Sequence, residues 1–207
     1  MGASTACYGS ILLDKLDERE LVERAAEDDH RAFQVLVERY QRKAYTVAFG
    51  ILRNEDEAMD VTQDAFVKVY KALPRFKGQA AFYTWLYRIV VNLCIDRKRK
   101  SSRRGEVAYE DTYTQGDDTA VAGPVLASTG IESPSAAYAR RELREQMSKA
   151  MDSLSERHRE ILVLREVQGL SYEELSDILE VPKGTIMSRL FHARKNFQQA
   201  LGRYLNT

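Results

Sequence analysis

The sequence predicts an all-α protein with two small helical domains joined by a flexible linker, the second domain containing a helix-turn-helix. Over most of the chain, apolar residues recur three or four positions apart, which is the spacing of a helix face. Residues 101–133 lack this period and are rich in Ser, Thr, Gly, Ala and Asp. Near the end of the chain, two short helical patterns flank a tight turn. We therefore expect domains at residues 17–100 and 134–207, a linker at 101–133 and a disordered N-terminus at 1–16.

The first domain begins with two predicted helices. The pattern DERE at residues 17–20 resembles a capping box and predicts a short helix that ends near Asp29. A long amphipathic helix follows, because apolar residues share one face across residues 33–51. The inward positions predicted for this second helix are Phe33, Leu36, Val37, Tyr40, Ala44, Val47, Ala48 and Ile51.

A third helix is predicted between Asn54 and Pro74. Asn54 is a good N-cap, with Glu57 three residues on, and Pro74 ends the helix. Its inward residues are Ala58, Val61, Ala65, Val69 and Leu73, and another face carries Asp60, Gln63, Asp64 and Lys71. A polar face of this kind either meets only water or binds a partner, and the spacing leaves both interpretations open.

Residues 76–100 combine aromatic rings with dense positive charge. A loop containing Gly78 precedes a helix predicted over residues 80–100. Between residues 75 and 104 there are nine Lys or Arg and one acid, Asp96. Aromatic rings stack on unpaired bases and cations contact phosphates, so the segment is typical of a surface for single-stranded nucleic acid. The alternative is a core helix with a solvated basic end.

Two stripes are predicted on this helix. The apolar stripe consists of Phe82, Trp85, Leu86, Ile89 and Leu93, and the polar stripe of Thr84, Arg88, Asn92 and Asp96. We expect Trp85 to belong to the core rather than to stack on bases. Asn92 either reads a base edge or is a structural amide. The basic residues 97–100 complement the helix dipole and are also suited to phosphate binding.

The second domain is predicted to contain four helices, which begin near residues 134, 155, 171 and 183. Ser133-Pro134 is typical of a helix start, Gly169 of a helix end, and Ser171 with Glu174 of a capping box. The predicted inward residues are Ile161, Leu162, Leu164, Tyr172, Leu175, Ile178, Leu179, Ile186, Leu190, Ala193, Phe197 and Leu201.

The last two helices, around a turn at residues 180–182, indicate a helix-turn-helix whose second helix reads duplex DNA. An ordinary helical hairpin is the alternative. The exposed face of the last helix carries Met187, Ser188, Phe191, His192 and Lys195, with Arg189 and Arg194 close by. His192 either donates to DNA or has no role there.

Charge and motifs restrict the classes of function. The 31 basic and 31 acidic residues give a net charge of zero, yet residues 183–207 carry five bases and no acid, and residues 105–138 six acids and no base. Such segregation suggests more than one partner, one of them a polyanion. The chain has no Walker loop, GxGxxG, HExxH or CxxC, and its three histidines are far apart. We therefore predict no enzyme, no metal and no cofactor.

Cysteine usage and hydropathy favour a cytoplasmic protein. Cys7 and Cys94 are too few for a disulfide framework or a zinc site, and we expect Cys94 to be a buried thiol. The N-terminus is a poor signal peptide, and no apolar run approaches the roughly 20 residues that span a bilayer. We therefore predict no membrane insertion.

Three stretches together resemble the bacterial sigma factors of the extracytoplasmic-function (ECF) group, group 4 of the sigma-70 family. They are DVTQDAF (residues 60–66), FYTWLYRIVVN (82–92) and LSYEELSDILEVPKGTIMSRLFHAR (170–194). The chain is most similar to the envelope-stress subgroup, over nearly all of residues 17–205. The resemblance implies a sigma domain 2 and a four-helix, winged-helix-like sigma domain 4. It implies a subunit that binds core RNA polymerase, directs it to promoter DNA and promotes strand opening, and a regulatory anti-sigma factor as a further partner.

The resemblance also implies roles for particular residues. Asp60, Gln63 and Asp64 match the surface that docks on core polymerase. The residues implied for the promoter −10 element, where a flipped base is captured, are Phe76, Lys77, Phe82, Tyr83, Arg88, Asn92, Arg97, Lys98 and Lys100. Those implied for the duplex −35 element are Lys183, Thr185, Met187, Ser188, Arg189, Phe191, His192, Arg194 and Lys195. The linker matches an acidic connector that runs through the polymerase cleft. Met187 and His192 stand where related members often have arginine.

Other classes of protein fit parts of the pattern. A stand-alone helix-turn-helix regulator would bind only duplex DNA and has no use for the aromatic and basic segment at residues 76–100. An enzyme, such as a nuclease, lacks a motif. A helical adaptor leaves the segregation of charge without an explanation.

Overall fold

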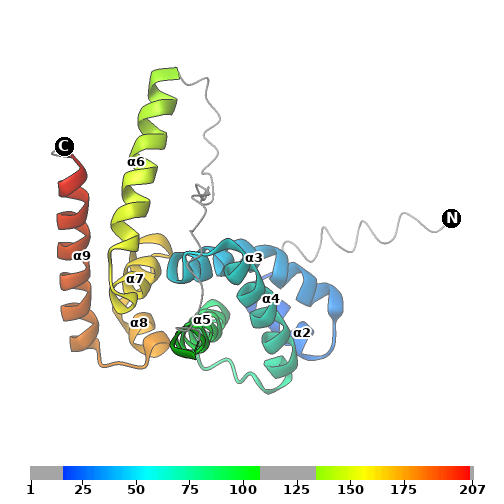
Figure 1. The fold of residues 1–207 in the computed structure, drawn as a ribbon. Helices are drawn as coiled ribbons and strands as arrows, with labels where there is room; N and C mark the ends of the chain where they lie inside the picture. The colour runs from blue at the N-terminus through cyan, green and yellow to red at the C-terminus, as the bar shows by residue number, and fades with distance from the viewer. Residues whose placement is uncertain (1–15, 108–133, 206–207) are drawn as a thin grey trace. The chain divides into compact units, whose positions relative to one another are not determined.

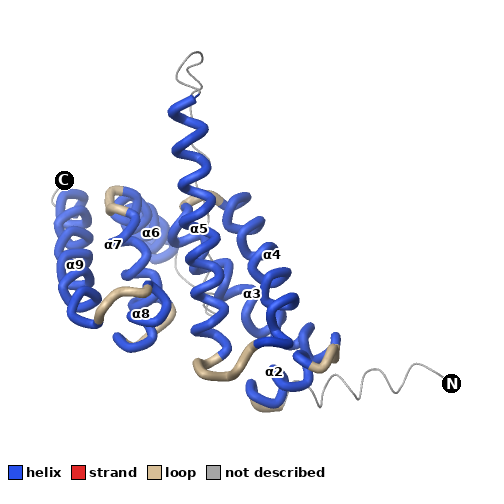
Figure 2. The backbone as a smooth tube through the Cα atoms, turned by 90° about the horizontal axis from the view of Figure 1, so that it is seen from below, coloured by secondary structure: helices blue, strands red, loops and turns tan. Residues whose placement is uncertain are grey.

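The computed structural model describes residues 16–107 and 134–205. Every regular element in this part of the chain is a helix, and no strand occurs in it (Figures 1 and 2). The chain divides into two compact units, one formed mainly by residues 1–101 and the other mainly by residues 102–207. The all-α fold class is confirmed. The predicted N-terminal tail and most of the predicted linker lie outside the described residues. No helix that the structure describes is long and apolar enough to cross a bilayer.

Unit 1 is a bundle in which the long helix α3 packs against α2 and α4 (Figure 1). The short 3-10 helix η1 packs against α2 and follows directly on α4. Fully buried side chains from every element of the bundle form one core, including Leu21, Leu36, Ile51, Leu73 and Leu86. The elements are α2 (Glu18–Ala26), α3 (His30–Leu52), α4 (Glu55–Ala72), η1 (Leu73–Arg75) and α5 (Phe82–Val107).

The start of α2 corrects one prediction. Asp17 stands at the N-cap, but its side chain makes no capping hydrogen bond, so the expected capping box is absent there. The helix ends at Ala26 rather than near Asp29. Asp28 then takes a left-handed conformation with φ 72°, which turns the chain into α3.

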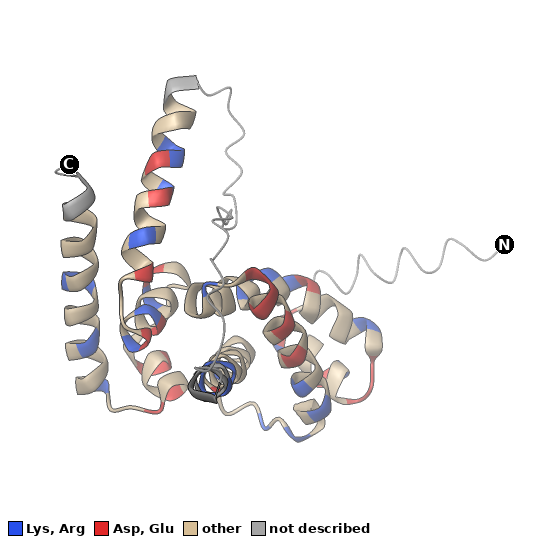
Figure 3. Ribbon diagram, viewed as in Figure 1, with Lys and Arg blue, Asp and Glu red and all other residues tan. Residues whose placement is uncertain are grey.

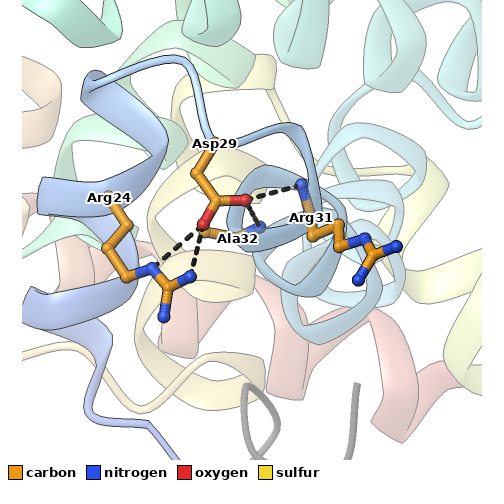
Figure 4. Close-up of polar contacts among 4 residues, drawn as sticks. All are labelled: Arg24, Asp29, Arg31 and Ala32. Carbon is orange, nitrogen blue, oxygen red and sulfur yellow. Dashed lines mark hydrogen bonds and ion pairs between the residues drawn. The ribbon is translucent and has the colours of Figure 1, made fainter. Parts of the chain in front are cut away.

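Asp29 instead caps α3 (Figure 4). Its Oδ1 accepts hydrogen bonds from the backbone N–H groups of Arg31 (3.0 Å) and Ala32 (3.1 Å). Its Oδ2 accepts from the Arg24 guanidinium of α2, at 3.0 Å from Nε and 2.6 Å from Nη2. The Ala32 N–H, followed by Arg24, lowers the pKa of the Asp29 carboxyl, because these donors stabilise its charged form. One carboxylate therefore joins the end of α2 to the start of α3.

The predictions for α4 are confirmed. The Asn54 side chain accepts a hydrogen bond from the Glu57 N–H at 2.9 Å, and the α-helix stops before Pro74. The predicted inward residues Ala58, Val61, Ala65, Val69 and Leu73 are all buried.

For α5, the predicted bounds and buried face are partly wrong. The helix begins at Phe82 and continues to Val107, into the segment predicted as linker. Ile89 and Leu93 are only half-buried. The side chains buried instead, beyond Phe82 and Leu86, are Thr84, Tyr87, Val90, Val91 and Cys94. A shift of one residue rotates a helix face by about 100°, so periodicity located the stripe only approximately. The buried Cys94 thiol is confirmed.

Unit 2 contains α6 (Pro134–Asp152), α7 (Glu156–Leu162), η2 (Val163–Val167), α8 (Tyr172–Leu179) and α9 (Lys183–Leu205), and α9 packs against α6 and α7. Gly169 has the left-handed φ of 73° expected after a helix. The capping box is confirmed: Ser171 N–H donates to the Glu174 carboxylate at 2.7 Å, and Glu174 N–H donates to the Ser171 hydroxyl at 3.2 Å. The turn η2 is π-helical, where one continuous α-helix was predicted.

Arg159 supplies a buried polar link that the sequence reasoning missed. Its guanidinium donates to the backbone carbonyls of Met151 (3.1 Å), Asp152 (3.1 Å) and Leu154 (3.0 Å). Carbonyls at a helix C-terminus lack partners within the helix, so Arg159 satisfies the end of α6 and ties it to α7.

Candidate nucleic-acid interface

The aromatic residues before and within α5 form one cluster. Phe76, from the loop after η1, stacks on Trp85 with ring centroids 4.6 Å apart and planes 26° apart. Phe76 also meets the edge of Phe82, at 6.5 Å and 90°. Gly78 in the same loop has the expected left-handed φ of 66°. The loop therefore places one aromatic ring directly on another at the start of α5.

The structure corrects the expectations for two of these rings. Phe82 is 2% exposed and packs against Tyr40 of α3 at 5.4 Å, so it anchors the cluster and has no free face for DNA. Trp85 was expected in the core, but it is only half-buried beneath Phe76. Tyr83 is half-buried and lies 6.1 Å from the Tyr87 ring.

Lys and Arg positions are found on α5, the helix that begins at this cluster (Figure 3). Asn92 is exposed, one helical turn from Arg88. The Nε of Arg88 is buried without a hydrogen-bond partner in the structure, and a buried donor of this kind is costly to leave unsatisfied. Lys77 and Lys100 are exposed, and Arg97 and Lys98 are half-buried. The α5 surface therefore offers rings, an amide and cations together.

The exposed face of α4 carries all three residues predicted for core polymerase, Asp60, Gln63 and Asp64. Two exposed apolar residues, Met59 and Val67, lie beside them at helical spacing, and sequence reasoning missed both. The sequence could have indicated them, because they are large apolar residues that do not belong to the inward-facing stripe of α4.

Asp60 also pairs with Arg97 of α5, with an oxygen-to-nitrogen distance of 3.4 Å. The structure thus brings together one residue predicted for the polymerase and one predicted for DNA.

Most of the residues predicted for the −35 element are exposed on α9. Met187 is 54% exposed and Phe191 is 64% exposed, one helical turn apart, and the His192 ring lies 5.4 Å from that of Phe191. Lys183, Thr185, Ser188, Arg194 and Lys195 are also exposed, whereas Arg189 is half-buried.

Two of the cations on α9 are held by carboxylates of neighbouring elements. Lys183 pairs with Glu173 of α8. Arg194 donates to the Glu166 carboxylate of η2 at 2.6 and 2.9 Å, and this hydrogen bond raises the pKa of Arg194. These pairs orient α9 against α8 and η2. In the part of the chain that the structure describes, no group of His, Cys, Asp or Glu side chains has the arrangement of a metal site.

Comparison with known proteins assigns both units. Residues 36–104 match the family model of Sigma-70 region 2, and residues 144–197 match that of Sigma-70, region 4. The chain is 38% identical over 194 residues to the RNA polymerase sigma-H factor of Pseudomonas aeruginosa, covering 92% of this chain and 96% of that protein. It is also 38% identical over 182 residues to the ECF RNA polymerase sigma-E factor of Escherichia coli, covering 88% and 93%.

The chain belongs to the ECF group of RNA polymerase sigma factors. Sigma factors are transcription initiation subunits. In this sigma factor, region 2 lies mainly in unit 1 and region 4 lies mainly in unit 2. Solved structures share its fold. One is CnrH in complex with the cytosolic domain of CnrY, with TM-score 0.58 and 25% identity over 90% of this chain and 97% of that one. Another is the sigma factor RpoE in complex with the anti-sigma factor NepR from Bartonella quintana, with TM-score 0.64 and 23% identity over 82% and 96%.

Proposed function

We propose that this sigma factor couples promoter recognition to strand opening through three surfaces. The exposed face of α4 binds core RNA polymerase, α5 with the loop before it binds the −10 element, and α9 binds the −35 element. The observation that carries the proposal is the stack of Phe76 on Trp85 at the start of a helix that carries an exposed amide and cations, inside the segment that matches Sigma-70 region 2. A protein that binds only duplex DNA has no need for such a surface.

At the −10 element, the aromatic cluster offsets the cost of melting. Opening a duplex costs roughly 1–2 kcal/mol per base-pair step. Stacking an unpaired base on an aromatic ring contributes about 1–3 kcal/mol. In the proposal, Phe76 provides the ring, Asn92 contacts the edge of the captured base, and Lys77, Arg97, Lys98 and Lys100 hold the phosphates of the opened strand.

At the −35 element, α9 reads the major groove with an apolar pair. Met187 and Phe191 are suited to contact with a thymine methyl group, the one apolar feature of a base edge in that groove. Lys195 holds a phosphate, Lys183 and Arg194 do so by exchanging their carboxylate partners Glu173 and Glu166 for phosphate oxygens, and His192 adds a polar contact. Met187 cannot donate hydrogen bonds to base edges as an arginine would. DNA shape therefore contributes a larger share of the specificity at this element.

For the domains, we propose residues 17–100 and 134–207 as the functional parts. Because α5 continues to Val107, residues 101–107 of the predicted linker are helical. Binding to core polymerase sets the distance between the two DNA surfaces, so the second contact gains effective concentration after the first. The free protein is therefore expected to bind promoters weakly.

We also propose that an anti-sigma factor regulates this protein. The support comes from two solved structures with its fold. According to their titles, one is a complex with the anti-sigma factor NepR, and the other is a complex with the cytosolic domain of CnrY. Together with core polymerase, the protein acts in the cytoplasm and contributes no catalytic residue of its own.

The test is transcription in vitro with purified bacterial core polymerase on a library of promoter-like templates, with and without this protein. Transcripts that require the protein are expected, and their upstream sequences would identify both promoter elements. Failure to bind core polymerase, together with tight binding of the free protein to a duplex, would refute the proposal in favour of a stand-alone regulator.

A further inference from the structure

One carboxylate joins three helices of unit 1 at the start of α5. Glu18 is the first residue of α2, and its Oε1 accepts a hydrogen bond from the backbone N–H of Phe82 at 3.3 Å. Its Oε2 accepts from the hydroxyl of Tyr40, on α3. Phe82 is the first residue of α5, and the first N–H groups of a helix have no acceptor within that helix. Glu18 therefore caps α5 from a position 64 residues earlier in the chain.

This cap lies at the end of the loop proposed to capture a base. Residues 76–81 connect η1 to α5, and together with α2 they line a cavity of about 800 Å³. An open groove therefore lies between α2 and part of this loop. Contacts at both ends hold the loop, among them the Phe76 stack on Trp85 at one end and the Phe82 N–H bond to Glu18 at the other.

The surroundings of Glu18 suit a fixed acceptor. The side chain is half-buried, and this burial raises the pKa of its carboxyl, while the Phe82 N–H opposes that shift. Arg39 and Lys43 of α3 favour the charged form, and Asp17 disfavours it. Two hydrogen bonds satisfy the carboxylate, one at each oxygen, so its partial burial leaves neither oxygen without a donor.

We propose that Glu18 is a positioning residue for promoter opening: it fixes the N-terminus of α5 and thereby the loop at residues 76–81 that presents Phe76. Glu18 precedes the segment that matches Sigma-70 region 2, residues 36–104, so the family comparison does not assign it a role. The inference rests on the proposed function of this loop. Its first test, however, requires no DNA.

Trp85 is the only tryptophan of the chain and stacks on Phe76, so its fluorescence reports the position of the loop. In the full-length protein, Glu18→Ala should raise the quenching of Trp85 by acrylamide at unchanged helix content. Glu18→Gln keeps an acceptor oxygen and should restore the wild-type value. The matched control is Glu20→Ala, which removes an exposed carboxylate on the same turn of α2 and should change nothing.

A second variant protects the test against misfolding. Tyr40→Phe removes one donor to Glu18 and keeps the aromatic contact with Phe82, so it should shift the quenching partly in the same direction. Unchanged quenching in a folded Glu18→Ala protein would overturn the proposal. So would a Glu18→Gln protein that is as strongly quenched as Glu18→Ala.

The DNA measurement uses a single-stranded oligonucleotide with the −10 sequence recovered from transcription, and a scrambled strand of equal length. Glu18→Ala should weaken binding by up to about fivefold, the factor that corresponds to an N-cap worth about 1 kcal/mol. Binding to a duplex −35 element should not change. If wild-type protein did not prefer the −10 strand, the proposed function of the loop would fail. Equal affinity of the wild-type and Glu18→Ala proteins for that strand would refute only the positioning role.

Discussion

Replacing Asp29 should lower the free energy of unfolding of unit 1, and the hydrogen bonds of its carboxylate set the size of this loss. The carboxylate accepts two backbone N–H groups at the start of α3 and also the Arg24 guanidinium of α2 (Figure 4). Loss of an N-cap side chain costs about 1 kcal/mol, within a range of roughly 0.5–2. An exposed charge pair adds at most about 1 kcal/mol. We therefore expect Asp29→Ala to lower the free energy of unfolding of unit 1 by about 1–2 kcal/mol.

Asp29→Asn separates the two contributions. Asn keeps an oxygen that accepts from the Arg31 and Ala32 N–H groups, but it loses the charge that faces Arg24, so the cost should stay below about 1 kcal/mol. Unfolding in urea is followed by the fluorescence of Trp85, which lies in unit 1 and is the only tryptophan. Unit 1 is thus measured separately from unit 2.

The pH dependence provides the sharper check. The pKa of Asp29 is lowered in the folded protein, so its charge stabilises the fold fully above the unfolded-state pKa. That contribution is lost as the pH falls through the lower, folded-state value. The difference in free energy of unfolding between wild type and Asp29→Asn should therefore be constant from pH 7 to about 5 and should shrink as the pH falls below about 4. The reasoning would be refuted if the Asn variant were as unstable as the Ala variant and if its difference in free energy of unfolding from wild type persisted at low pH.

Three further substitutions test the functional surfaces. Asp60→Asn should weaken the binding of core polymerase in a titration, yet shift the free energy of unfolding by less than about 1 kcal/mol, because its pair with Arg97 is exposed. Equal affinity for core would remove Asp60 from the docking surface. Lys100→Gln should reduce the slope of log K against log salt for single-stranded −10 DNA by about 0.7, and an unchanged slope would mean that Lys100 holds no phosphate. Phe191→Ala should leave stability within about 0.5 kcal/mol, as expected of an exposed residue. In fluorescence anisotropy it should bind the −35 duplex more weakly, and full affinity would contradict the proposed apolar contact.

Several features of this protein follow from the sequence alone because they depend on neighbouring residues. The buried face of α4, the cap at Asn54, the capping box of Ser171 and Glu174, and the left-handed Gly78 and Gly169 are all local, and these are confirmed. Sigma-factor membership was also readable, because its motifs are contiguous stretches. The residue roles at the two promoter elements stay predictions.

Only the tertiary structure decided how distant segments share side chains. Periodicity could not show that α5 buries Val90 and Cys94 rather than Ile89 and Leu93, because a one-residue difference turns the face by about 100°. Nor could a local motif show that Glu18 caps α5, or that Asp60 pairs with Arg97. Each of these contacts joins residues more than 30 positions apart, and their partners are chosen by how the helices pack, which no short stretch of sequence encodes.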